Sequence, residues 1–142
     1  MPTLQALTMT HGRALALLVA SLFVQGCPEE RATWIGNASR ASAITLVFGR
    51  VRGRPEPTRV SSLYLYRCQV PGRGNGIEFI WRLNAEANSA KLDSLVLGQV
   101  PRGYTSDPAT LPALSGCYTA ANGDAQVDFF VRPDSTVVEL RP

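Results

Sequence analysis

Alternation of apolar and polar residues, broken by turn-forming residues, limits this chain to a narrow set of folds. The alternation has the two-residue period of a half-buried β-strand, and no segment shows a convincing 3.6-residue helical period. The alternating segments are 42–51, 60–68, 77–84, 94–100, 116–121, 125–132 and 135–140, with a further short strand expected at 32–36. Seven or eight short strands separated by glycine, proline, asparagine and aspartate predict an all-β fold, a single antiparallel β-sandwich.

The alternation also predicts which side chains share a face of a strand. Segment 60–68 places Leu63 and Leu65 on one face, and Tyr64, Tyr66 and Cys68 on the other. Segment 77–84 is the cleanest case, and its expected buried face carries Ile77, Phe79, Trp81 and Leu83. Between strands, residues 85–92 are expected to form one helical turn. Residues 101–115, which contain three prolines, are expected to cross from one sheet to the other.

The first 26 residues have the three-part plan of a secretory signal. A weakly basic start with Arg13 precedes an apolar run, Ala14 to Val24, that is shorter than the roughly 20 residues needed to span a bilayer. The run ends in Val24-Gln25-Gly26-Cys27, which resembles the bacterial lipobox. This resemblance implies cleavage before Cys27 and acylation of its sulfur and freed amine. Several acyl chains anchor a protein stably where one does not.

The number of cysteines agrees with lipidation of Cys27. Three cysteines are an odd number for an oxidising compartment, and lipidation leaves Cys68 and Cys117 free to pair. A structural disulfide is favoured over a redox pair because the two lack the Cys-x-x-Cys spacing. The expected organisation is a signal peptide at 1–26, a short tether at 27–33 and a β-sandwich domain at 34–142. Such a tether holds the domain close to the inner or outer membrane of the cell envelope.

Charge and histidine content restrict the function. The formal net charge is +3, and removal of residues 1–26, whose one charged side chain is Arg13, leaves +2, so no nucleic-acid partner is expected. The single histidine, His11, lies in the expected signal peptide. The mature chain then has no imidazole for Ser–His or Cys–His catalysis, for general acid–base chemistry or for zinc. We expect no enzyme activity, no cofactor and no metal.

The order of Cys68, Trp81 and Cys117 resembles immunoglobulin-like domains, in which a cysteine strand, a tryptophan and a second cysteine strand follow one another. Residues 114–118 and the hairpin after them also resemble the closing strands of transthyretin-like envelope modules. One departure is that Tyr118 follows Cys117 directly, instead of preceding it by two residues. If Tyr118 and Leu65 face the core, both cysteines face away from it, and the disulfide is expected on an outer face or at a sheet end.

A second resemblance is to membrane-bound inhibitors of C-type lysozyme, which are small disulfide-bonded β lipoproteins. Tyr66-Arg67-Cys68 matches the Tyr-x-Cys strand of that family. Ser115-Gly116-Cys117-Tyr118 is one residue shorter than its Ser-Gly-x-x-Tyr loop. The inhibitory lysine of the family is absent, and Arg132 is the nearest candidate for its position.

Two groups of side chains are candidate binding sites. Four arginines, Arg50, Arg52, Arg54 and Arg59, form a candidate anion site, for which a solvated hairpin tip is the favoured interpretation. The aromatic residues form a candidate surface for sugars or peptides, for which packing against the sheets is favoured. They are Trp34, Tyr64, Tyr66, Tyr104 and Tyr118.

The leading hypothesis is therefore a non-catalytic, lipid-anchored binding or scaffolding module of the cell envelope. Its candidate partner-binding residues are Tyr64, Tyr66, Ser115 and Tyr118, and its partner is expected to be a protein or the cell wall. The alternative hypothesis is an inhibitor of an extracellular hydrolase such as C-type lysozyme. The residue patterns predict no particular oligomeric state.

Overall fold

The computed structural model describes residues 31–69 and 76–140. Within these ranges the chain forms nine β-strands and no helix, which confirms the all-β class. The strands are β1 (Ala32–Ile35), β2 (Thr45–Gly49), β3 (Ser62–Arg67), β4 (Phe79–Ala85), β5 (Ser94–Val96), β6 (Tyr104–Asp107), β7 (Gly116–Asn122), β8 (Ala125–Val131) and β9 (Val137–Leu140). The expected signal peptide and Cys27 lie outside the described residues.

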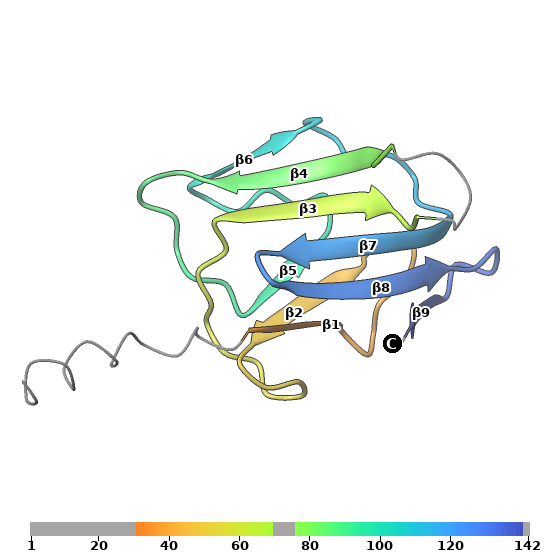
Figure 1. Ribbon diagram of the computed structural model, residues 1–142, viewed down its shortest axis with the longest axis horizontal. Coiled ribbons are helices and arrows are strands. Elements are labelled where there is room, and N and C mark those ends of the chain that lie inside the picture. Colours follow the sequence, from red (N-terminus) through yellow and green to blue (C-terminus); the bar gives the residue numbers. More distant parts are fainter. Residues whose placement is uncertain (1–30, 70–75, 141–142) are drawn as a thin grey trace, which may run out of the picture.

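The strands form two antiparallel sheets around one core. A six-stranded sheet has the order β6-β4-β3-β7-β8-β9, and a three-stranded sheet has the order β1-β2-β5. Figure 1 shows the smaller sheet behind the larger one. Apolar side chains from both sheets, among them Leu46, Phe48, Leu63 and Trp81, form a single buried cluster. Removing this apolar surface from water is the main force that holds the two layers together.

Strand β6 was not predicted, and it raises the number of strands to nine. It lies inside the expected connection 101–115 and pairs with the edge of β4. Its sequence, Tyr-Thr-Ser-Asp, holds one large apolar residue, so alternation cannot reveal it. The expected crossing is confirmed, because β5 belongs to the small sheet and β6 to the large one. Residues 85–92 contain a turn, closed by a hydrogen bond from Ser89 N to Glu86 O, and not the helical turn predicted for them.

Glu139 of β9 connects the edges of the two sheets. Its carboxylate accepts a hydrogen bond of 3.1 Å from the backbone N–H of Ile35 in β1 and forms an ion pair with Arg52. The Glu139 side chain is only 15% exposed. A charged acceptor makes a shorter and stronger hydrogen bond than a neutral one, so this carboxylate is well suited to satisfy a backbone donor at an unpaired strand edge.

The disulfide between Cys68 and Cys117 lies outside the core. It joins residues 49 positions apart, with a Cα–Cα distance of 5.4 Å, beside the ends of β3 and β7. Leu65 and Tyr118 are buried, whereas the two cysteines are half-buried. Because neighbours along a strand face opposite ways, the cysteines lie on the outer side of the large sheet. Both the predicted pairing and the predicted position away from the core are confirmed.

Candidate functional site

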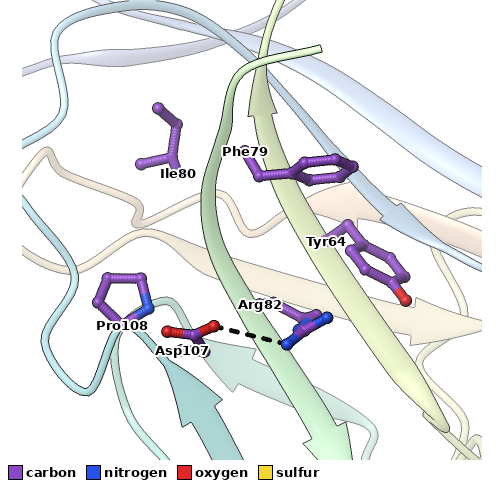
Figure 2. A pocket seen from close by; sticks show the side chains of 6 residues that line it. All are labelled: Tyr64, Phe79, Ile80, Arg82, Asp107 and Pro108. Carbon is purple, nitrogen blue, oxygen red and sulfur yellow. Dashed lines mark hydrogen bonds and ion pairs between the residues drawn. The ribbon is translucent and has the colours of Figure 1, made fainter.

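A row of polar and aromatic side chains crosses three neighbouring strands on the outer face of the six-stranded sheet. Tyr64 of β3 is the register partner of Arg82 of β4, and Arg82 is the partner of Asp107 of β6. Figure 2 shows the guanidinium of Arg82 between the Tyr64 ring and the Asp107 carboxylate. Arg82 Nη2 lies 3.5 Å from Asp107 Oδ2. Sheet register therefore brings together three residues from distant parts of the chain.

A β-bulge in β4 adds a large aromatic ring to this row. Leu65 is paired with Trp81, but the next residue of β3, Tyr66, is paired with Phe79, which leaves Ile80 as an extra residue. One extra residue reverses the alternation, so that residues before and after it face opposite ways. Trp81 is 1% exposed and Phe79 is 60% exposed. The prediction that Ile77 and Phe79 share the buried face of Trp81 and Leu83 is wrong, since Ile77 is also exposed.

The bulge gathers three aromatic rings on the outer face of the sheet. The Phe79 ring centroid lies 5.8 Å from that of Tyr64 and 6.2 Å from that of Tyr66, with the ring planes inclined at 56° and 71°. These are the tilted and edge-to-face arrangements that aromatic pairs prefer. The rings form an apolar surface of limited size that stays in contact with water.

Beside these rings lies a hollow of about 390 Å³, a size within the range of ligand-binding pockets. We call it the aromatic hollow, and the residues that line it are Tyr64, Phe79, Ile80, Arg82, Asp107 and Pro108 (Figure 2). The bond between Asp107 and Pro108 is a cis peptide. The hollow therefore combines flat apolar walls with a cation and an anion at one side. Such a site can hold a flat or extended ligand by contact and orient it by hydrogen bonds.

The predicted aromatic surface is only partly present. Tyr64 and Tyr66 are half-buried on the outer face as expected, but Trp34, Tyr104 and Tyr118 are buried. Packing, the favoured interpretation, therefore holds for those three. Phe79 takes part in the surface, although strict alternation predicted it to be buried. The one sequence signal of this was the run Phe79-Ile80-Trp81, because three consecutive apolar residues depart from alternation.

Tyr118 is not available to a partner. It is 1% exposed, and its ring stacks on that of Phe129 in the core with a centroid distance of 5.8 Å. Its hydroxyl donates to the Ser115 carbonyl over 2.9 Å and accepts from the Ser115 N–H over 3.0 Å. Ser115 itself is exposed. The expectation that Tyr118 lies on a binding surface is therefore wrong, because the hydroxyl is already satisfied by backbone groups and the ring fills the core.

The four arginines of the candidate anion site do not all lie together. Arg52 pairs with Glu139, and Arg50 Nε lies 3.5 Å from Glu56 Oε1. Arg54 is exposed at the tip of a turn in which its N–H donates to the carbonyl of Val51. Arg59 lies apart from this tip and lines a smaller hollow together with Arg50. The four residues therefore do not form one site.

The described residues hold no cluster of metal-ligating side chains, and Asp134, whose pKa is lowered, lies outside the aromatic hollow. Across residues 31–69 and 76–140, no three histidine, cysteine, aspartate or glutamate side chains gather where they could hold a metal ion. The pKa of Asp134 lies below its usual value because the hydroxyl and then the backbone N–H of Thr136 donate to its carboxylate. Asp134 belongs to the turn between β8 and β9, so this shift reflects turn geometry and not a reactive group in the aromatic hollow.

Comparison of the chain with protein-family models, with curated proteins and with solved structures found no significant match. No helix in the described part of the chain is long and apolar enough to cross a membrane. The geometry of the aromatic hollow is therefore the basis for the functional proposal.

Proposed function

We propose that this protein is a lipid-anchored module of the cell envelope that binds a partner through the aromatic hollow, without catalysis. The observation that carries the proposal is the exposed ring of Phe79, which the bulge turns to the outer face beside Tyr64 and Tyr66. Burial of a phenylalanine side chain is worth roughly 1.5–3 kcal/mol, so exposing one forgoes folding stability. A partner that covers the ring recovers this free energy on binding.

The ion pair at the side of the aromatic hollow predicts that the partner carries polar groups. Arg82 and Asp107 are largely exposed, so their attraction contributes about 0–1 kcal/mol in the free protein. A partner that excludes water from the hollow strengthens hydrogen bonds to both groups. We therefore expect a partner with a flat apolar face and neighbouring hydroxyl, amide or charged groups. Cell-wall glycan and protein segments both have this chemistry.

The membrane anchor in this proposal rests on Val24-Gln25-Gly26-Cys27. The Cys27→Ser variant is expected to move from the membrane fraction to the soluble fraction, because serine has no thiol to accept a lipid and the apolar run before it is short. Fractionation of intact cells and the mass of the Cys27 peptide measure this. Globomycin, which blocks signal peptidase II, is expected to cause the unmodified precursor to accumulate. An unmodified Cys27 in the mature protein would rule out the anchor.

The aromatic hollow is tested by site-specific photo-crosslinking. p-Benzoylphenylalanine in place of Phe79 is expected to capture the partner in intact cells at about tenfold higher yield than the same probe in place of Phe130. Truncation of a central contact residue, most often tryptophan, tyrosine or arginine, typically costs about 2 kcal/mol or more in binding. Arg82→Ala is therefore expected to reduce the yield at position 79. Digestion of the adduct with a muramidase or with a protease distinguishes a glycan partner from a protein partner.

Phe130 is a matched control, because it is also an exposed phenylalanine of the large sheet but lies on β8. Equal capture at positions 79 and 130 would show that the aromatic hollow is not the binding site. Capture that does not depend on Arg82 would show that the ion pair has no part in recognition.

The alternative hypothesis, inhibition of a hydrolase such as C-type lysozyme, gains no support from residues 115–118. The family resemblance implies an accessible tyrosine loop, whereas Tyr118 is buried. The immunoglobulin-like or transthyretin-like relationship also stays a prediction. The two-sheet arrangement supports it, but sheets of six and three strands differ from the four-and-three division of constant-type immunoglobulin domains.

A further inference from the structure

A second hollow, of about 90 Å³, gathers positive charge from three separate parts of the chain. Its cations are Arg31, which precedes β1, Arg50 and Arg59 of the β2–β3 connection, and Lys91 of the β4–β5 connection. We call it the basic hollow. Glu56 is the one carboxylate among its lining residues, and it is paired with Arg50. Arg31, Arg59 and Lys91 have no carboxylate partner within 4 Å among the described residues.

Backbone hydrogen bonds hold this charge in place. Thr58 N donates to Leu92 O over 2.8 Å, and Leu92 N donates to Thr58 O over 2.9 Å, so the two connections are joined beside Arg59 and Lys91. Glu56 N donates to Phe48 O over 2.9 Å and ties the β2–β3 connection to β2. Like charges repel, and a fold that fixes them side by side forgoes stability. An anion held between them attracts each cation and so offsets this repulsion.

The position of the basic hollow relative to the anchor indicates which anion it meets. Arg31 follows Cys27 by four residues, which span at most about 14 Å when extended. An acyl chain on Cys27 would therefore keep the hollow within reach of lipid head groups. In Figure 1 the β2–β3 connection lies at the end of the molecule where β1 begins. Tyr66 lies near the other end of β3, away from this connection.

We propose that the basic hollow binds the phosphate of an anionic membrane lipid and so sets the orientation of the domain on the bilayer. This inference rests on the lipid anchor of the proposed function. Basic residues near an anionic surface each contribute about 1 kcal/mol of attraction. When the basic hollow lies at the bilayer, the opposite ends of the strands of the large sheet lie away from the membrane. The rings of Phe79 and Tyr66 lie near those far ends.

Lys91 makes the inference testable, because it is the only lysine of the chain. The full lipidated protein is placed in vesicles of phosphatidylcholine, with or without added phosphatidylglycerol, and exposed to a membrane-impermeant amine reagent. Modification of Lys91 is measured by mass spectrometry. The rate is expected to fall about tenfold with phosphatidylglycerol, the factor that corresponds to about 1.4 kcal/mol. Inorganic phosphate added to the phosphatidylcholine vesicles is expected to leave the rate unchanged.

Matched charge variants show whether the basic hollow itself is responsible for the protection of Lys91. Arg59→Gln is expected to abolish most of the protection of Lys91. Arg40→Gln removes the same charge from an exposed residue between β1 and β2, and is expected to leave the protection intact. Equal modification of Lys91 in both kinds of vesicle would overturn the inference, as would equal loss of protection in both variants. Protection by inorganic phosphate alone would overturn the lipid as the source of the anion.

The Cys27→Ser variant separates this inference from the proposed anchor. If the basic hollow recognises the lipid phosphate, an excess of phosphatidylglycerol vesicles still protects Lys91 in this unanchored protein. If protection is absent in both the anchored and the unanchored protein, the hollow does not bind the lipid. Lipidation of Cys27 is read from the mass of its peptide in the same samples, so a missing anchor and an inactive hollow give different results.

Discussion

Replacement of both Cys68 and Cys117 by serine is expected to lower the free energy of unfolding by about 4 kcal/mol. The disulfide closes a loop between residues 49 positions apart, and it restricts the unfolded chain far more than the folded one, in which β3 and β7 are already paired. Small domains are stable by about 5–15 kcal/mol, so this loss removes roughly a quarter or more of the stability, and the variant is expected to unfold at a markedly lower urea concentration. Urea denaturation followed by tryptophan fluorescence measures the loss.

Reduction offers an independent measurement of the same effect. Dithiothreitol is expected to shift the urea midpoint of the natural protein to that of the double variant, and to leave the double variant unchanged. A thioether at Cys27 is not reduced by dithiothreitol, so the anchor does not interfere with this comparison. A loss of stability below about 1 kcal/mol would contradict the prediction, since it would mean that the disulfide does not stabilise the fold by closing this loop.

Trp81→Ala and Phe79→Ala are expected to differ greatly in their effect on stability, although the two residues are separated by one position in β4. Trp81 is buried between the sheets, and its truncation leaves a large cavity, which costs roughly 3–5 kcal/mol. Phe79 is 60% exposed on the outer face, and its truncation is expected to cost no more than about 1.5 kcal/mol, from the loss of its contacts with Tyr64 and Tyr66. Urea denaturation of the two variants, followed by circular dichroism, measures the difference.

This pair of variants also tests the bulge at Ile80. With strict alternation the two rings would share one face, and both substitutions would be strongly destabilising. A large destabilisation by Phe79→Ala would therefore contradict the outward position of the ring, and with it the aromatic hollow. The crosslinking experiment at Phe79 relies on the same point, because a probe can replace the side chain without unfolding the domain only if the ring is exposed.

The strands that alternation predicts are those with several apolar residues on one face. In β8, for example, Val127, Phe129 and Val131 are buried and Gln126 is exposed. Burial of one face is the dominant free energy for such a segment, so the local pattern and the final structure agree. Strand β6 has no such apolar face. Besides the buried ring of Tyr104, it is held by backbone hydrogen bonds to β4, and these depend little on side-chain type.

The candidate sites depend on contacts between segments that are distant in the sequence. The approach of Arg59 to Lys91 is set by the backbone pairing of Thr58 with Leu92. The approach of Tyr64 to Arg82 and Asp107 is set by the register of three strands. Arg52 lies between Arg50 and Arg54 in the chain, yet it binds Glu139 from the far end of the chain. No local pattern contains these pairings.

Residue order alone was enough to predict an all-β domain of antiparallel strands, with Cys68 and Cys117 paired away from the core. The strands and the outward position of the cysteines follow from side-chain polarity and two-residue alternation, which are local, and the pairing follows from the number of cysteines. Which aromatic residues meet solvent, and which cations share a hollow, depended on the folded structure. One extra residue in β4 decides which face Phe79 takes, and a few backbone hydrogen bonds between connections align the segments that carry the cations. Such pairings bring together side chains that are far apart in the sequence.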